Sequence, residues 1–381
     1  MTRYRFDQIA ENSTAKKKPE ESDRNRYVGL EHLDPGTLEV TRWGAEVTPK
    51  GDKLLMKKGD VLFGRRRAYQ KKVGIAPFDG IFSAHGMVLR PKADVVDPMF
   101  FPFFISSDIF LDEAIRVSVG SLSPTANWKD LRTLEFDLPS PGKQRELAGI
   151  LSEAESLKGY YRKMLTTCDD VVKSQFVEMF GEPAENPKGW ETSSLTSLGS
   201  CKNGMNFKSK ESGIELPCLG VGDFKDRSVI NDVSEMGRIN LDDEPAEGYF
   251  LKDGDIVFVR SNGNKELVGR CLAVYPHGEK AVFSGFCIRL RVESDKVRIP
   301  YLIWALKQPS MRQQMFGRGA NVQNLNQKLM AKVDVPIPPL AEQDRFLALV
   351  SIVDKSKFAI QKALDELNAT TKKILNQELG L

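Results

Sequence analysis

The sequence predicts a mixed α/β fold built as a tandem repeat, with two α/β globes separated by two long helices that pack antiparallel as a coiled coil, in a pseudo-two-fold arrangement. Three observations predict it. Short matches recur in the same order in both halves of the 381-residue chain, a heptad pattern follows a proline-rich segment in each half, and the rest of each half consists mainly of short β-type runs. A chain of this length also favours two domains.

The internal repeat consists of short matches whose order is preserved. FSAHGMVLR at 82–90 aligns with FSGFCIRLR at 283–291, and GDVLFGR at 59–65 aligns with GDIVFVR at 254–260. After Gln144 and Gln343 the alignment continues without a gap at a constant offset, 343 − 144 = 199. The chain therefore reads as a duplication of a unit of about 200 residues.

The repeat sets the expected domain boundaries. We expect the first globe at 1–137, its long helix at 138–181, the second globe at 182–334 and its long helix at 335–381. Runs such as DVLFG, FSAHGMVL and DIVFV are typical of strands, and one helix of about five turns is expected after Pro98 or Pro300. A second, short helix is expected near Asn127 and near Asn324.

Each predicted long helix follows two prolines and a glutamine, in LPSPGKQ at 138–144 and VPIPPLAEQ at 335–343. Proline lacks an amide donor and disfavours the helical conformation of the residue before it, so the first helix is expected to run from Gln144 to about Phe180. Gly181 marks its end. LPSPGKQ reads as two residues shorter than its counterpart, so the two helix entries need not be equivalent.

The heptad pattern predicts which residues face the partner helix. Apolar residues alternate at three-residue and four-residue spacing, which is typical of a coiled-coil seam, whereas two helices lying separately on globular cores would show a wider stripe near period 3.6. The expected seam consists of Leu147, Ile150, Ala154, Leu157, Tyr161, Met164, Cys168 and Val171 in the first copy, and Phe346, Leu349, Val353, Ile360, Ala363 and Leu367 in the second, with small hydroxyl residues at Ser356 and Thr370.

Composition excludes several classes of protein. Five cysteines without a C-x-x-C pair are typical of reduced thiols in a cytoplasm, and three isolated histidines do not suggest a zinc site. The N-terminus lacks the apolar core of a signal peptide, and the longest apolar block, at 100–110, is too short to span a bilayer. We therefore expect a soluble cytoplasmic protein. Because the net charge is only +3, affinity for a polyanion must come from local basic patches.

Motifs for catalysis are missing from the sequence. It contains no G-x-x-x-x-G-K-[ST] phosphate loop, no H-E-x-x-H, no G-x-S-x-G and no Asn-Pro-Pro-aromatic tetrapeptide of the kind that amino-methyltransferases carry. The triplet Asp223-Phe224-Lys225 fits a degenerate nuclease pattern, but it does not recur in the other repeat and reads better as a solvated strand end. We expect no catalytic residue and no metal site.

Candidate DNA-binding residues fall in two loops of each repeat. GRRRAYQKK follows the GDVLF strand and RSNGNKELVGR follows the GDIVF strand; arginine can pair with guanine, Asn or Gln with adenine, and all of them can hold phosphate. SVGSLSPTANWK and GRGANVQNLNQK form a second candidate surface, although their Asn residues suit helix capping equally well. A charged turn that is simply solvated is the alternative for the basic run. The candidates are Arg65, Arg66, Arg67, Tyr69, Gln70, Lys71, Lys72, Ser121, Arg260, Asn262, Asn264, Lys265, Asn321 and Gln323.

The chain resembles the specificity subunit of Type I restriction-modification systems. The resemblance rests on the ordered pair LPSPGKQ and VPIPPLAEQ, each leading into a heptad helix, and on KSQFVEMFG at the end of the first helix. The resemblance covers nearly the full length and implies a non-catalytic subunit whose two target-recognition domains each read one half of a bipartite DNA site across a nonspecific spacer.

The same resemblance implies the partners and cofactors. They are double-stranded DNA, two modification subunits that carry S-adenosylmethionine and methylate adenine, and restriction subunits that can join and use ATP and Mg; this chain itself is expected to bind no cofactor. Two alternatives from other classes stay open. One is a coiled-coil scaffold with two protein-binding globes, and the other is a stand-alone DNA-modifying enzyme with unrecognised motifs.

Overall fold

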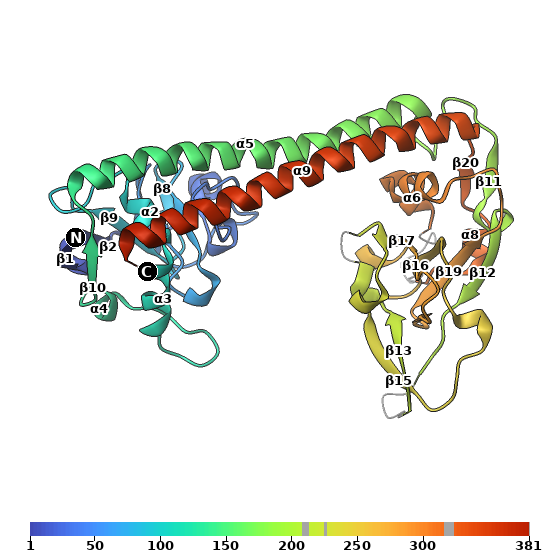
Figure 1. The fold of residues 1–381 in the computed structure, drawn as a ribbon, viewed down its shortest axis with the longest axis horizontal. Helices are drawn as coiled ribbons and strands as arrows, with labels where there is room; N and C mark the ends of the chain where they lie inside the picture. The colour runs from blue at the N-terminus through green and yellow to red at the C-terminus, as the bar shows by residue number, and fades with distance from the viewer. Residues whose placement is uncertain (208–212, 225–226, 316–323, 381) are drawn as a thin grey trace. The chain divides into compact units, whose positions relative to one another are not determined.

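The computed structural model describes residues 1–207, 213–224, 227–315 and 324–380 and divides into two compact units (Figure 1). Unit 1 contains residues 1–166 and 358–381, and unit 2 contains residues 167–357. Each unit therefore combines one α/β globe with part of each long helix, whereas the sequence-based boundaries treat the helices as separate segments.

The two long helices, α5 (Pro141–Phe180) and α9 (Leu340–Leu379), each have 40 residues and correspond at the constant offset, 340 − 141 = 199. Helix α5 begins at Pro141 rather than at Gln144, because the first helical position does not need an amide donor. Gly181 ends α5 as predicted, with φ +76° and its N–H donated to the Val177 carbonyl at 2.8 Å. Neither long helix, nor any other helix of the described ranges, is apolar enough over sufficient length to cross a bilayer.

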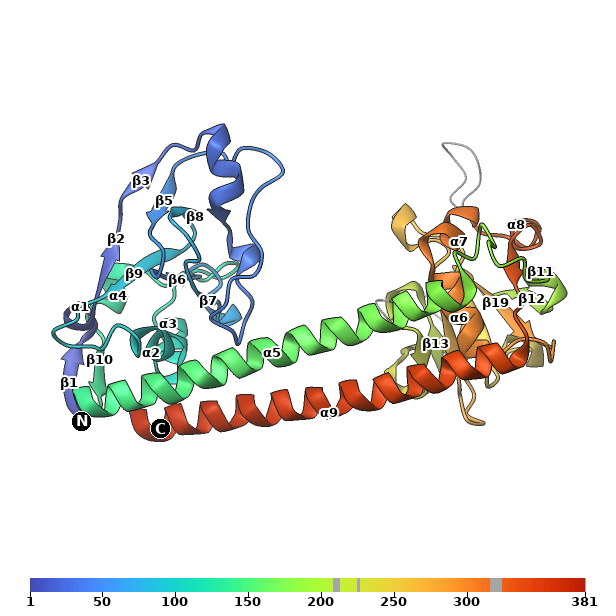
Figure 2. The same ribbon diagram turned by 90° about the horizontal axis from the view of Figure 1, so that it is seen from above.

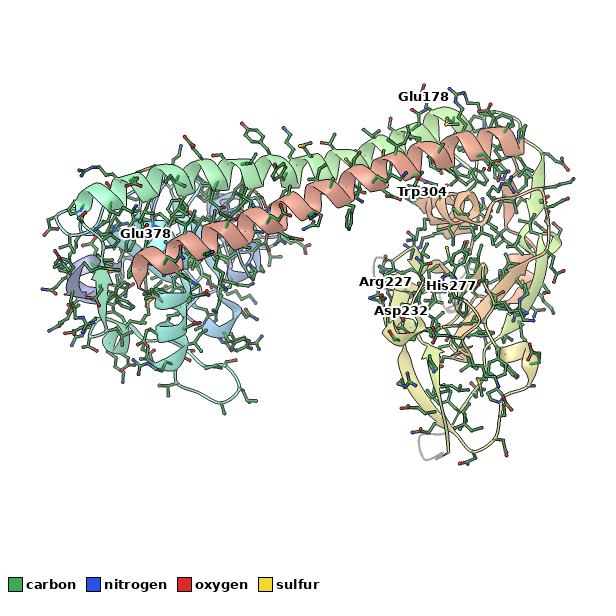
Figure 3. All side chains as sticks on the ribbon, in the orientation of Figure 1. Glu178, Arg227, Asp232, His277, Trp304 and Glu378 are labelled. Carbon is green, nitrogen blue, oxygen red and sulfur yellow. The ribbon has the colours of Figure 1, made fainter. Side chains whose placement is uncertain are left out.

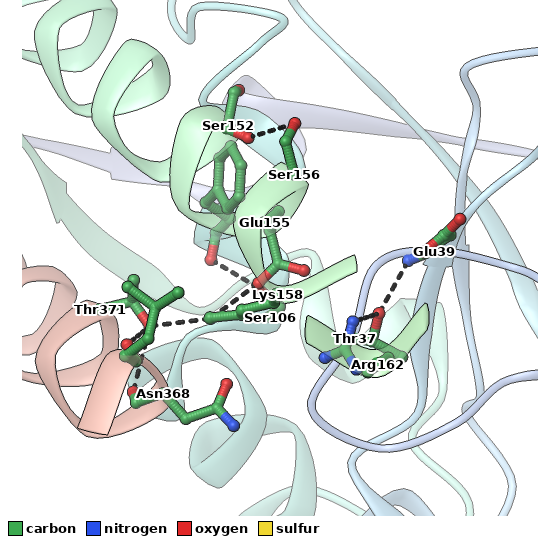
Figure 4. Close-up of polar contacts among 12 residues, drawn as sticks. Thr37, Glu39, Ser106, Ser152, Glu155, Ser156, Lys158, Arg162, Asn368 and Thr371 are labelled. Carbon is green, nitrogen blue, oxygen red and sulfur yellow. Dashed lines mark hydrogen bonds and ion pairs between the residues drawn. The ribbon is translucent and has the colours of Figure 1, made fainter. Parts of the chain in front are cut away.

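In unit 1 the two helices lie side by side and antiparallel (Figure 2). The Lys143 ammonium lies 3.2 Å from a Glu378 carboxylate oxygen, and the buried Lys158 ammonium donates to the Thr371 hydroxyl at 2.8 Å. Lys158 also pairs with Glu155 one turn earlier at 2.8 Å (Figure 4). A buried ammonium group is thus satisfied by one partner from each helix.

In unit 2 the helices meet through aromatic rings. The Phe346 ring of α9 lies 5.4 Å from the Phe176 ring and 5.5 Å from the Phe180 ring of α5, measured between centroids. Trp304 packs on Phe346 at 5.8 Å and belongs to α6 (Ile299–Lys307), the helix beneath the pair (Figure 3). Burial of these large rings joins the helix ends to the globe of unit 2.

The predicted seam of α5 is wrong at every second position. Ile150, Leu157, Met164 and Val171 are between 41% and 48% exposed. The buried residues lie one position later, at Leu151, Lys158 and Val172. Of the remaining predicted positions, Leu147 and Phe346 are buried, and those that are partly buried are Ala154, Tyr161, Cys168, Leu349, Val353, Ile360, Ala363 and Leu367.

The globe of unit 1 contains three small sheets. One four-stranded sheet has the order β2 (Ala10–Ser13), β9 (Met87–Pro91), β6 (Val61–Phe63), β7 (Val73–Ile75), and the other has the order β3 (Lys16–Lys17), β5 (Lys53–Met56), β8 (Gly80–Phe82), β4 (Tyr27–Val28). A two-stranded sheet joins β1 (Thr2–Arg5) to β10 (Glu135–Leu138). The short helices are α1 (Phe6–Ile9), α2 (Phe101–Ser106), α3 (Asp108–Arg116) and α4 (Trp128–Leu131).

The globe of unit 2 repeats this plan. Its five-stranded sheet has the order β12 (Gly199–Asn203), β19 (Cys287–Val292), β16 (Asp255–Val259), β17 (Cys271–Val274), β14 (Val229–Ile230). A three-stranded sheet has the order β15 (Gly237–Leu241), β13 (Ile214–Leu219), β18 (Val282–Phe283), and a two-stranded sheet joins β11 (Thr192–Ser194) to β20 (Asp334–Pro336). The remaining helices are α6, α7 (Pro309–Gln314) and α8 (Gln327–Met330).

The central sheet of each globe is buried on both faces. In β16, Ile256 and Phe258 enter the core that contains the helix ends, whereas Val257 and Val259 enter a second core on the opposite face. Side chains alternate between the two faces of a strand, so every residue of the apolar run is buried in one of the two cores. This explains why the GDVLF and GDIVF strands read as continuous apolar segments.

An ion pair between a buried aspartate and a half-buried arginine fixes the start of this strand in both units. Asp60 accepts two hydrogen bonds from the Arg90 guanidinium, both at 2.8 Å. Asp255 accepts two from Arg291, at 2.8 and 2.7 Å. Bidentate pairing of this kind orients both partners, and it accounts for the aspartate of GDVLF and GDIVF and the final arginine of the FS…LR segments.

The prediction of a single helix of about five turns after Pro98 or Pro300 is wrong. In each unit two shorter helices, α2 and α3 or α6 and α7, replace it. In unit 1, Ser107 leaves the helical conformation and caps α3, its hydroxyl accepting from the Phe110 N–H at 3.3 Å. In unit 2, Pro309 excludes Gln308 from the helical region, where ψ is 138°. The short helix expected at Asn324 is instead capped by Asn326, which accepts from the Leu329 N–H at 3.0 Å.

The glutamine of each proline-rich motif joins the long helix to its globe. Gln144 is buried, accepts from the Asp97 N–H at 2.8 Å and donates to the Pro139 carbonyl at 2.9 Å. Gln343 is buried, accepts from the Arg298 N–H at 2.8 Å and donates to the Pro338 carbonyl at 2.7 Å. Both glutamines reach the carbonyl five residues back, so Pro139 corresponds to Pro338 and the expected two-residue difference between the joints is wrong.

Candidate nucleic-acid interface

Three segments meet at the end of strand β6 in unit 1. The Arg66 N–H donates to the His85 carbonyl at 3.2 Å, which joins the loop after β6 to the turn between β8 and β9. The Ala126 N–H donates to the Arg65 carbonyl at 3.0 Å, and Arg66 forms an antiparallel bridge with Thr125. The basic loop and the Gly120 loop, which the sequence presents as two candidate surfaces, therefore form one surface.

The same three segments meet in unit 2 with the same backbone pattern. The Ser261 N–H donates to the Phe286 carbonyl at 3.2 Å, and the Leu325 N–H donates to the Arg260 carbonyl at 2.8 Å. Ser261 forms an antiparallel bridge with Asn324. We call this arrangement the loop junction of each unit.

The shared contacts establish which positions of the two loop junctions correspond. The corresponding pairs are Arg65 with Arg260, Arg66 with Ser261, His85 with Phe286, and Thr125 with Asn324. Only the first pair carries the same side chain. The backbone of the loop junction is thus repeated, while the groups that it presents differ.

The loop junction of unit 1 presents guanidinium groups. Arg66 and Arg67 are exposed, and the Arg66 guanidinium lies 3.3 Å from the His85 imidazole. Arg65 is half-buried and donates to the Asn127 amide oxygen at 3.4 Å. Partial burial and the positive charges of Arg66 and Arg65 hold the pKa of His85 below its usual range. This surface suits a polyanion.

Arg67 has a left-handed backbone conformation, with φ 56°. Its N–H donates to the Pro124 carbonyl at 2.7 Å, and its guanidinium donates to the Ser123 hydroxyl at 3.4 Å. The neighbouring 119–125 loop therefore holds this residue in a conformation that non-glycine residues rarely adopt. Strained residues of this kind cluster at functional sites.

The two lysines of GRRRAYQKK make intramolecular contacts instead of extending from the loop. The Lys71 ammonium lies 2.9 Å from Asp108 and 2.7 Å from Asp112 of α3, and Lys72 donates to the Leu30 carbonyl at 2.7 Å. Burial alone would raise the pKa of Asp108, but the ammonium groups of Lys372 and Lys71 hold it at about 2. Between the arginines and these lysines, Tyr69 is exposed and Gln70 is half-buried.

Residues 119–125 form a narrow loop beside the arginines. Val119 and Thr125 exchange two backbone hydrogen bonds, at 3.1 and 3.0 Å, and Gly120 has φ +118°, a conformation that favours glycine. Ser121 is exposed, and Leu122 at the tip is 91% exposed. The loop presents a small polar and a large apolar side chain next to the guanidinium groups.

The loop junction of unit 2 presents hydroxyl and amide groups. Arg260 is half-buried and donates to the Gly285 carbonyl at 3.1 Å. The side-chain oxygens of Asn262 and Asn264 accept from the Asn264 and Glu266 N–H groups at 2.8 and 3.0 Å, which shapes the loop. Asn321, Gln323 and the side chain of Lys265 lie outside the described residues.

Groups for catalysis are not assembled in the part of the chain that the structure describes. No group of three or more His, Cys, Asp and Glu side chains there could hold a metal ion. Burial raises the pKa of Cys201 to about 11 and that of Cys271 to about 12, so both thiols are protonated at neutral pH. Asp223 accepts from the Gly220 N–H at 2.8 Å within a turn, and Lys225 lies outside the described residues.

Several residues of the loop junctions do not appear among the sequence-based candidates: His85, Leu122, Thr125, Ser261, Phe286 and Asn324. His85 and Phe286 occupy the same column of the repeat alignment, and both are exposed although the residues around them are buried. An aromatic ring at the same turn of both repeats is the signal that could have identified them. Leu122 carries no comparable signal in the sequence.

Comparisons with known proteins agree with the repeat. The profile of the Type I restriction modification DNA specificity domain matches residues 4–158 and 187–377. The specificity subunit of the StySPI Type I restriction enzyme from Salmonella potsdam is 25% identical over 355 residues, covering 87% of this chain and 74% of that protein. The EcoKI specificity subunit from Escherichia coli is 24% identical over 362 residues, again covering 87% of this chain and 74% of that protein.

Solved structures share the fold. A chain from work on the complex assembly and conformational transition of the type I R-M system aligns with a TM-score of 0.61 at 18% identity, covering 99% of this chain and 97% of that one. The S subunit of a Type I system from M. genitalium aligns with a TM-score of 0.52 at 16% identity, covering 100% of this chain and 96% of that one.

Proposed function

The chain belongs to the family of Type I restriction modification DNA specificity domains, and from this premise we propose that it is a non-catalytic subunit that recognises a bipartite DNA target. Unit 1 reads one half of the target and unit 2 reads the other, with a nonspecific spacer between them. The modification and restriction activities belong to partner subunits that this chain directs to the site.

The observation that carries this proposal is the pair of loop junctions with one backbone pattern and different side chains. Corresponding positions hold Arg66 and Ser261, and Thr125 and Asn324. Guanidinium groups match the acceptors of guanine, whereas amides match the donor and acceptor of adenine. Two junctions with different donors would therefore select different half-sites, while the repeated backbone gives each junction the same local arrangement.

We also propose that α5 and α9 form an antiparallel coiled-coil spacer related by pseudo-two-fold symmetry, which sets the distance between half-sites. A 40-residue helix is about 60 Å long at about 1.5 Å per residue. Inserting four residues, about one turn, into one helix should lengthen the preferred DNA spacer by one or two base pairs. An unchanged DNA spacer length in a stably folded insertion variant would contradict the proposal that the helices set the distance between half-sites.

The partners are double-stranded DNA, two modification subunits and, where cleavage occurs, restriction subunits. Along α5, Ile150, Leu157 and Met164 repeat at seven-residue spacing and are exposed, with Tyr160 beside them. An exposed apolar stripe of this kind marks a protein interaction site. It supports docking of the modification subunits on the helices, with S-adenosylmethionine, ATP and Mg bound by partner subunits in the cytoplasm.

The test is to express the chain with its modification subunit in a host and to sequence the methylome. We expect methylated adenines in a bipartite motif. Replacing residues 65–72 with an uncharged loop should change or abolish the first half of the motif alone. Loss of both halves would indicate misfolding or a nonspecific role and would count against the proposal.

Binding measurements on the purified chain separate the alternatives. A scaffold with two protein-binding globes would bind no DNA with or without the modification subunit. A stand-alone enzyme would modify DNA by itself. We expect specific binding together with the modification subunit and no modification without it.

A further inference from the structure

Phe286 is an exposed aromatic residue on a fixed backbone. It lies in the turn between β18 and β19, and its side chain is 61% exposed. Its carbonyl accepts from the Arg260 N–H at 2.8 Å and from the Ser261 N–H at 3.2 Å, and its N–H donates to the Ser284 hydroxyl at 3.3 Å. The ring therefore projects from a position that three hydrogen bonds hold in place.

The fold does not require a phenylalanine at this position. His85 occupies the corresponding place in unit 1, with the same backbone bond from the loop after the strand, and there the ring is polar and contacts Arg66. The β18–β19 turn is thus compatible with a polar side chain. Exposing an apolar ring in unit 2 has no structural benefit, which suggests that the ring is covered by a ligand.

The surroundings of Phe286 indicate which ligand covers it. Ser261 and the exposed Asn324, which pair across the loop junction, place a hydroxyl and an amide in the segments beside the ring's turn. In the major groove an A·T pair presents the C5-methyl and O4 of thymine beside the N6 and N7 of adenine, so an apolar group next to hydroxyl and amide groups matches it. A G·C pair has no methyl group for the ring to contact.

We propose that Phe286 contacts the C5-methyl group of a thymine in the second half-site and thereby selects an A·T pair at that position. This inference rests on the proposed function, since it names one contact within the half-site that unit 2 reads.

The experiment uses the full chain assembled with its modification subunit and a duplex carrying the motif found by methylome sequencing. Each thymine of the second half-site is replaced in turn by uracil, which lacks only the methyl group. One replacement should weaken binding about fourfold, the factor that corresponds to burial of a single methyl group. Phe286→Ala should weaken binding to the thymine duplex at least as much and should remove the difference between thymine and uracil.

Two variants serve as controls. Phe286→Leu keeps an apolar side chain and should retain a preference for thymine, and Val229→Ala removes an exposed apolar side chain elsewhere in unit 2 and should leave the preference unchanged. Unchanged discrimination at the other positions of the second half-site shows that unit 2 of each variant is folded.

The inference is overturned if no uracil replacement affects binding, or if Phe286→Ala still distinguishes thymine from uracil. A rise in 2-aminopurine fluorescence that requires Phe286, without any uracil effect, would also overturn it, because the ring would then insert between bases. Failure of the unmodified complex to select either half-site would instead refute the proposed function.

Discussion

Replacing Gln343 with alanine should unfold the joint between α9 and the globe of unit 2. The side chain is buried and makes three hydrogen bonds to backbone groups. It accepts from the Arg298 N–H at 2.8 Å and donates to the Pro338 carbonyl at 2.7 Å and the Lys296 carbonyl at 3.0 Å. Alanine would leave all three groups without this partner in a place that water reaches poorly.

The magnitude follows from the number of groups that lose their partner. Each unsatisfied buried group costs about 1–1.5 kcal/mol, so Gln343→Ala should lower the free energy of unfolding by about 3–4.5 kcal/mol. Gln144→Ala removes two such bonds, to Asp97 and Pro139, and should cost about 2–3 kcal/mol. The two variants should therefore differ by about 1 kcal/mol, which is roughly fivefold in the unfolding equilibrium.

Hydrogen exchange followed by mass spectrometry is the suitable assay, because the chain has two units whose unfolding it can report separately. Protection should fall at 296–298 and at the start of α9 in Gln343→Ala, and around 97 and 139–144 in Gln144→Ala. Gln361→Ala, an exposed site on α9, is the matched control and should change stability by less than about 0.5 kcal/mol. Equal effects of Gln343→Ala and Gln361→Ala would refute the reasoning, as would a larger effect of Gln144→Ala.

Three further predictions concern charge and exposed surface. The pKa of Asp108, at about 2, lies below its unfolded value, so the ion pairs should contribute about 1–2 kcal/mol above about pH 4 and lose it as the pH falls toward 2; acid titration of unfolding should show a smaller loss in Asp108→Asn. The double variant Arg66→Ala, Arg67→Ala should reduce the slope of log binding constant against log salt concentration by about 0.9 for each phosphate that it no longer neutralises. An unchanged slope would show that neither arginine contacts a phosphate. Ile150→Ser with Leu157→Ser should leave the melting temperature nearly unchanged but weaken co-purification of the modification subunit; intact assembly would place docking elsewhere.

The heptad period predicted both long helices but not which face of α5 is buried. Ile150 and Leu157 are apolar at seven-residue spacing and therefore resemble a seam, whereas the buried positions one residue later are a leucine, Leu151, and a lysine, Lys158. Lys158 can be buried because Glu155 and Thr371 satisfy its ammonium group, and only the folded structure brings Thr371 to it. A pattern of apolar residues cannot locate a core position that is occupied by a paired charge.

The candidate site, too, could be predicted from the sequence only in part. The loop after each GD strand could be found from the repeat, because a basic or amide-rich segment follows the same strand twice. The segments that contact this loop could not be found from the sequence. The contact between Arg66 and His85, for example, depends on strand pairing that brings separate turns together. The ammonium group of Lys71 is not available to a ligand because it pairs with Asp108 and Asp112 of α3. The sequence does not specify where this helix lies relative to the loop.

The division of the chain into units has a consequence for synthesis on the ribosome. Unit 2 is one continuous segment, 167–357, and can form all its internal contacts as soon as that segment has emerged. Unit 1 needs Leu375 and Leu379, which close the core formed by its first 166 residues. The globe that is translated first is therefore completed last, and during that interval the apolar surface that these leucines cover stays open to solvent and to chaperones.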